Sequence, residues 1–95
     1  MIDEAHLDEV LRALSHAQRR RFVRLCMSQE RSAGELAEQS DLGLASVSEH
    51  LKVLRKCGLL VLEVRGRHWM YRTDSRFLQA TTQAVKRLSE GIDGP

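Results

Sequence analysis

Residues 32–58 read SAGELAEQSDLGLASVSEHLKVLRKCG and carry the pattern of two helices joined by a tight turn. Ser32 and Glu35 have the spacing of a capping box, in which each side chain accepts a hydrogen bond from the backbone amide of the other residue. This spacing predicts a short helix over residues 33–39. Residues 40–43, SDLG, favour a turn and predict the connection to the next helix.

A longer helix is predicted over residues 44–56, because its apolar residues recur at intervals of three and four. Gly58 suits the left-handed backbone conformation that often follows a helix C-terminus. Two helices joined in this way form a helix-turn-helix, here residues 33–56, whose second helix can enter the major groove of DNA. The apolar positions of that second helix are Leu44, Val47, Leu51 and Leu54.

The spacing of the apolar residues changes after Gly58 and predicts a β-hairpin over residues 59–73. Residues 59–65 are rich in alternating aliphatic residues, residues 65–67 (RGR) favour a turn, and residues 68–73 predict the returning strand. A helix-turn-helix followed by a basic hairpin is a winged helix. The predicted fold class is therefore mainly α with a two-stranded β-hairpin (α+β), in the order four helices, two strands, one helix.

Amphipathic helices are predicted at both ends of the chain, over residues 3–14 with Asp3 as N-cap and over residues 75–90. A further helix runs through residues 22–27, and residues 92–95 are expected to form a frayed tail. A chain of 95 residues has little core, so the apolar stripes of the two terminal helices are expected to meet in a homodimer. The predicted dimer-interface residues are Leu7, Val10, Leu11, Leu78, Thr81, Val85 and Leu88.

The composition is that of one small globular domain over residues 1–95. Hydrophobic residues make up 42% and charged residues 29%, which excludes a disordered chain. We expect neither a membrane span nor a secretory signal, because no long apolar run exists and the N-terminus is acidic. The two cysteines cannot build a disulfide framework, so the cytoplasm is the expected compartment. No catalytic constellation or phosphate-binding loop is recognisable, so an enzyme is not expected.

The net charge of +2 conceals an uneven distribution. The first nine residues hold four acids and no Lys or Arg, whereas residues 42–73 hold six basic residues and two acids. This segregation favours a face that binds a polyanion, although an unevenly charged solvated surface would give the same pattern. The predicted DNA contacts lie on the second helix of the helix-turn-helix and at the hairpin tip. They are Ser46, Ser48, Glu49, His50, Lys52, Arg55, Arg65, Arg67 and His68.

Two groups of basic side chains keep alternative interpretations. His50 could contact a phosphate or make a structural hydrogen bond. The arginines at positions 19, 20, 21 and 24 cannot all face DNA, because consecutive helical residues point about 100° apart. Some of them are expected to pair with acids, such as Glu30, Glu38 or those at the N-terminus.

The same residues resemble the ArsR/SmtB family of winged-helix repressors over roughly residues 13–73. Residues 35–38 (ELAE) and 47–60 (VSEHLKVLRKCGLL) are similar to the family pattern ELAE…VSxHLxxLRxAGLV, and residues 65–72 (RGRHWMYR) to its wing, xxGRxxxYR. Residues 13–21 (ALSHAQRRR) are similar to ALADPTRxR, with alanine replacing the usual proline. The resemblance implies a homodimeric, cytoplasmic repressor whose first and last helices dimerise and whose operator affinity is lowered by an inducer.

The metal sites known in that family have no counterpart here. Residues 35–40 lack the Cys-x-Cys pair, and residues 75–90 contain no His or Cys and only one acid. No metal or other cofactor is therefore expected, and the expected partners are a double-stranded DNA operator and a second copy of the chain. Two alternatives stay open. One is a winged helix that binds proteins, because a fold does not fix a function. The other is a thiol- or metal-responsive repressor using Cys26, Cys57 or the pair His6 and His16.

Overall fold

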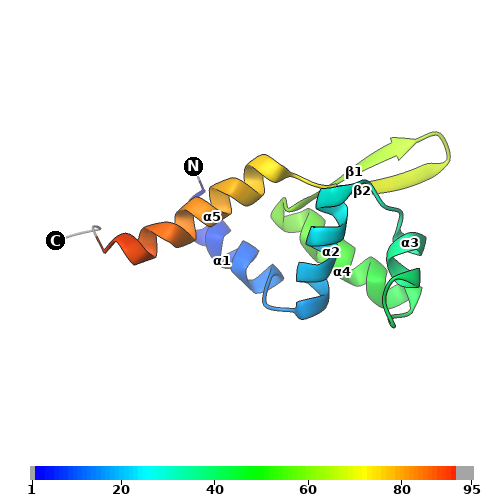
Figure 1. Ribbon diagram of the computed structural model, residues 1–95, viewed down its shortest axis with the longest axis horizontal. Coiled ribbons are helices and arrows are strands. Elements are labelled where there is room, and N and C mark those ends of the chain that lie inside the picture. Colours follow the sequence, from blue (N-terminus) through cyan, green and yellow to red (C-terminus); the bar gives the residue numbers. More distant parts are fainter. Residues whose placement is uncertain (1, 92–95) are drawn as a thin grey trace.

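Five helices and one two-stranded antiparallel sheet make up the part of the chain that the computed structural model describes, residues 2–91. Their order confirms the predicted fold class. The tail expected over residues 92–95 lies outside the described residues. The elements in Figure 1 are α1 (Glu4–Ala13), α2 (Ala17–Ser28), α3 (Ala33–Glu38), α4 (Leu44–Cys57), β1 (Leu60–Arg65), β2 (His68–Thr73) and α5 (Ser75–Glu90).

Local side-chain bonds explain where α1, α3 and α5 begin. Asp3 and Asp74 each accept a hydrogen bond from the backbone amide three residues later, at 2.8 and 3.1 Å. The capping box is confirmed, since Ser32 accepts from the amide of Glu35 at 3.1 Å and Glu35 accepts from the amide of Ser32 at 2.8 Å. Gly58 follows the C-terminal end of α4 and has φ of 98°, the left-handed conformation that its position in the sequence predicts.

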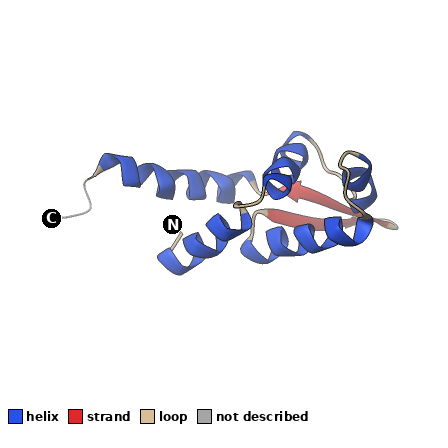
Figure 2. Cartoon of the chain, turned by 90° about the horizontal axis from the view of Figure 1, so that it is seen from below, coloured by secondary structure: helices blue, strands red, loops and turns tan. Residues whose placement is uncertain are grey.

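The inner side of α4 lies at the centre of the core. Val47, Leu51 and Leu54 are at most 1% exposed and cluster with Phe22 of α2 and Leu36 of α3. Figure 2 shows the two strands lying between helices on either side. Leu44, the first apolar position of α4, is 56% exposed, so the helix is held by its apolar side from Val47 onward. Its opposite side is presented to solvent in a fixed orientation.

The hairpin is also attached to the loop between α2 and α3. Arg31 and Tyr71 exchange two backbone hydrogen bonds, of 2.9 and 2.8 Å, so that the loop adds one bridge to the edge of β2. The buried Thr73 hydroxyl donates to the carbonyl of Val23 in α2 at 2.8 Å. These bonds fix the base of the hairpin relative to α3 and α4.

Two arginines near the start of α2 donate hydrogen bonds to carbonyls at the end of α1. Arg19 and Arg20 donate to the carbonyls of Ala13 and Leu14, at 3.4 and 2.7 Å. Cationic groups are favourable there because the carbonyl end of a helix carries partial negative charge. The expectation that some arginines from 19 to 24 pair with acids is wrong for the described residues, since none of the ion pairs among them includes one of these side chains.

The last helix extends well beyond the winged helix. The molecule measures 52 × 26 × 21 Å, and Figures 1 and 2 show α5 accounting for much of the long dimension, with α1 beside its first half. Three apolar side chains of these two helices are left exposed, Leu11 at 42%, Val85 at 41% and Leu88 at 72%. None of the described helices is long and apolar enough to cross a membrane.

Three of the predicted dimer-interface residues, Leu7, Val10 and Thr81, are already largely buried within their own chain. The Thr81 hydroxyl donates to the carbonyl of Phe77, which satisfies it inside α5. The helical spacing identified the apolar stripes of the two terminal helices. It did not show which of their residues pack inside the chain and which remain exposed.

Candidate nucleic-acid interface

The exposed side of α4 is apolar at its start (Leu44 and Ala45), polar in its middle and basic towards its C-terminal end. Towards its C-terminal end, Lys52, Arg55 and Lys56 line a shallow depression of about 320 Å³. Lys56 was not among the predicted contacts, although its sequence position beside Arg55 could have indicated it. The predicted contacts that are exposed on this helix are Ser46, Ser48, Glu49, Lys52 and Arg55.

His50 differs from the other predicted contacts on α4 because it is half-buried. Its Nδ1 accepts a hydrogen bond from Nε of Arg19 in α2 at 3.0 Å, and its ring lies edge-on to Phe22. Burial lowers the pKa of His50, and the nearby cations Arg19 and His16 lower it further. The structural hydrogen bond, one of the two interpretations left open by the sequence, is present.

The hairpin carries its basic residues at a narrow tip. The strands pair in register from Leu60 with Thr73 to Arg65 with His68, and Gly66 makes the turn with φ of 64°. Arg67 takes part in no ion pair among residues 2–91 and is exposed. A cation without an internal partner is free to pair with a phosphate.

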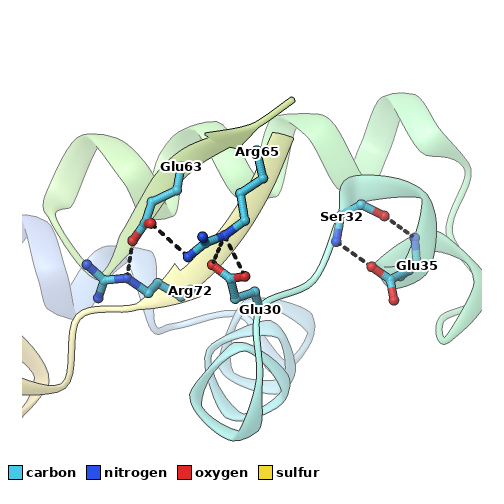
Figure 3. Close-up of polar contacts among 6 residues, drawn as sticks. All are labelled: Glu30, Ser32, Glu35, Glu63, Arg65 and Arg72. Atoms are coloured by element: carbon cyan, nitrogen blue, oxygen red, sulfur yellow. Dashed lines mark hydrogen bonds and ion pairs between the residues drawn. The ribbon is translucent and has the colours of Figure 1, made fainter. Parts of the chain in front are cut away.

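Arg65, in contrast, is held by two carboxylates of its own chain. Figure 3 shows its guanidinium between Glu30, at 2.8 Å, and Glu63, at 3.1 Å. Glu63 also accepts a hydrogen bond from Arg72 across the hairpin. The bond from Arg72 holds the pKa of the Glu63 carboxyl below its usual range, and the bond to Glu30 raises the pKa of Arg65. Arg65 is therefore partly neutralised before any DNA arrives.

This network braces the wing against α2. Glu30 lies just after α2, whereas Arg65 ends β1, so their ion pair ties the tip of the hairpin to the helical body. On the same side, Arg65 and His68 line an open cavity of about 490 Å³ with Ser32 and Glu35 of the α3 start. Sequence reasoning missed Glu30 as part of the site, and its 35-residue separation from Arg65 left no local signal.

The surroundings of the two thiols make them unreactive. Cys26 and Cys57 are free and buried in the core. Burial raises the pKa of Cys26 to about 11 and also raises the pKa of Cys57. Since the thiolate is the reactive and metal-binding form, both side chains are poor nucleophiles and poor ligands at neutral pH.

The histidines considered as ligands have different surroundings. His6 is half-buried rather than solvated, its Nε2 donates to the carbonyl of Cys57 at 2.8 Å and its ring stacks on Phe77. His16 is exposed and its ring lies 6.0 Å from that of His50. Among residues 2–91, no group of three or more His, Cys, Asp or Glu side chains is arranged to hold a metal ion.

A helix-turn-helix with an exposed basic helix and a basic wing is the architecture of DNA-binding regulators. A family profile described as "Helix-turn-helix domain" matches residues 14–63. Together with the structural likenesses below, this match shows that the chain belongs to the ArsR/SmtB family of winged helix-turn-helix transcriptional regulators. Comparison with curated proteins finds no match.

Several solved structures share the fold. An ArsR-like transcriptional regulator from Rhodococcus sp. RHA1 is 28% identical, with a TM-score of 0.84 over 94% of this chain and 84% of that one. A "possible transcriptional regulator for arsenical resistance" is 34% identical, with a TM-score of 0.73 over 87% of this chain and 84% of that one. A homodimeric winged helix-turn-helix DNA-binding domain from Mycobacterium bovis is 22% identical, with a TM-score of 0.70 over 98% and 92% of the two chains.

Proposed function

We propose that this DNA-binding regulator is a homodimeric repressor that binds an inverted-repeat operator in the cytoplasm. The observation that carries the proposal is the asymmetry of α4. Its inner side is fully buried, while its polar outer side is left uncovered by its own chain. A rigidly seated helix with a free polar face, followed by a basic hairpin tip, suits the major groove and the adjacent phosphates.

The residues of the site have separate roles in this proposal. Ser46 and Ser48, in the first turns of α4, donate hydrogen bonds to phosphates or base edges, and Glu49 accepts from a cytosine amine. Lys52 and Arg55 neutralise phosphates along the groove. At the wing, Arg67 and His68 approach the neighbouring backbone, whereas Arg65 must exchange a carboxylate for a phosphate to do so. His50 acts indirectly by fixing α4 on α2.

Dimerisation would use the two terminal helices. In this proposal, residues 1–95 form one domain in which residues 3–14 and 75–90 dimerise, residues 33–56 read DNA and residues 59–73 form the wing. The exposed stripe of Leu11, Val85 and Leu88 supports it, as does the homodimeric state of the Mycobacterium bovis domain with the same fold. A two-fold dimer would hold its recognition helices about 34–36 Å apart, which requires an inverted repeat.

The proposal is tested by titrating the protein into a fluorescent duplex from its own upstream region at several salt concentrations. Affinity is expected to fall with salt, with a log–log slope of about −0.9 for each phosphate neutralised. Lys52→Ala should weaken binding and reduce this slope by about 1, whereas Lys86→Ala on α5 serves as the charge-matched control. Binding that is insensitive to salt, or equal effects of the two substitutions, would contradict the proposal.

A further inference from the structure

One face of the hairpin continues past the core. Cross-strand partners share a face, so Leu60–Thr73, Leu62–Tyr71 and Val64–Trp69 lie on the same side of the sheet. Leu60, Thr73 and Tyr71 are buried, at 2%, 5% and 8% exposed. The last pair, nearest the tip, is exposed, with Val64 at 62% and Trp69 at 59%. The face that holds the hairpin on the domain thus ends in an uncovered apolar pair.

This pair contributes little to the fold of a single chain. Neither Val64 nor Trp69 belongs to the core cluster or to the residues packed against it. A strand position that faces solvent and contacts no partner is ordinarily polar, as Arg72 is on the opposite face. An exposed tryptophan and valine side by side therefore indicate a contact made outside the chain.

The charge around the pair selects the kind of partner. The turn between Val64 and Trp69 consists of Arg65, Gly66, Arg67 and His68, and Arg67 has no ion-pair partner among the described residues. A second copy of the chain would bring two basic tips together at this surface, which is unfavourable. A surface that offers phosphates beside apolar deoxyribose and base edges matches both the charge and the apolar pair.

We propose that Val64 and Trp69 are DNA-contact residues of the wing. Trp69 packs against the deoxyriboses and base edges of the groove that the wing enters, while Arg67 and His68 engage the flanking phosphates. Apolar side chains that enter the minor groove are an established way for proteins to bind duplex DNA. The inference rests on the proposed function, because it requires that the wing meets DNA.

Trp69 is the one tryptophan of the chain, so its intrinsic fluorescence reports on this contact directly. The wild-type chain is titrated with a duplex from its own upstream region, and acrylamide quenching is measured before and after saturation. Trp69 emission is expected to change, and its accessibility to acrylamide to fall, at the DNA concentration that saturates binding. Dilution of the protein without DNA should leave the emission unchanged; a change there would overturn the inference by assigning the pair to a second copy.

Affinity is measured in parallel with labelled duplex. Trp69→Ala should weaken binding by about tenfold, Trp69→Phe by less, and Val64→Ala by a few-fold, because each change removes apolar surface from the contact. Met27→Ala, which truncates another exposed apolar side chain on α2, is the matched control and should bind as the wild type does. If the wild type binds but Trp69→Ala binds equally well, or Trp69 stays accessible at saturation, the inference fails while the proposed function survives. If the wild type binds no duplex, both fail.

Discussion

Gly58 follows the C-terminal end of α4 and lies next to Phe77 of α5. Its φ of 98° is strained for any residue with a side chain, and a Cβ placed there would lie 3.3 Å from Cε2 of Phe77 in α5. Gly58→Ala should therefore lower the free energy of unfolding by about 1–2 kcal/mol, measured by urea denaturation. Gly34→Ala in α3 is the control, because its Cβ would meet only Ser32 Oγ at 3.8 Å. Equal stability of the two variants would contradict this reading of Gly58.

His50 makes the seating of α4 sensitive to acid. Because the pKa of His50 is lowered in the folded chain, the unfolded chain binds its proton first as pH falls. The stability it contributes is thus complete above its ordinary pKa of about 6.5 and is lost as pH falls through that value towards the lower folded pKa. His50→Gln can still accept the bond from Arg19 but does not titrate.

Urea unfolding at pH 7.5 and 5.5 should therefore show a larger loss for the wild type than for His50→Gln. The comparison of the two proteins isolates the contribution of position 50. Parallel losses in the two proteins would show that His50 protonation is not coupled to folding.

At the scale of elements, the features set by neighbouring residues could be predicted, and those set by distant residues could not. The capping box of Ser32 and Glu35 and the turn at Gly66 depend on local chemistry, so the sequence defines both. The bridge between Arg31 and Tyr71 depends on how the chain folds back, and no periodicity encodes it. For the same reason, the spacing predicted that Arg65 lies at a basic tip but not that two carboxylates hold it.

The ion pair between Glu30 and Arg65 has two opposing effects on DNA binding. Glu30 orients Arg65, but it also places a negative charge near the approaching phosphates. Exposed ion pairs contribute little to stability, and Arg65 keeps Glu63 as a partner, so we expect the charge effect to win. Glu30→Gln should raise DNA affinity about threefold at low salt and leave the melting temperature nearly unchanged.

Glu90→Gln, which removes the same charge at the end of α5, is the control for net charge and should change affinity less. Weaker binding by Glu30→Gln would mean that orientation of the wing outweighs charge. Anisotropy titrations at two salt concentrations distinguish these outcomes, because an electrostatic gain disappears as salt rises.

At the scale of the whole molecule, α5 extends its apolar stripe away from its own core, so assembly and DNA binding should be linked. Leu88 is 72% exposed, and a carboxylate there would be buried without a partner in both halves of a two-fold interface. Leu88→Glu should therefore give a monomer of 10.8 kDa where the wild type has twice that mass, as measured by light scattering. Gln83→Glu, on the opposite face of α5, adds the same charge and should stay dimeric.

The same substitution separates half-site binding from operator binding. A dimer holds its second α4 close to the second half-site, and such linkage raises affinity by about 10²–10⁴-fold over one site alone. Leu88→Glu should thus lose most of its affinity for the full inverted repeat while binding an isolated half-site as weakly as the wild type does. Full operator affinity in a variant shown to be monomeric would mean that one winged helix suffices, and the inverted repeat would then have no structural basis.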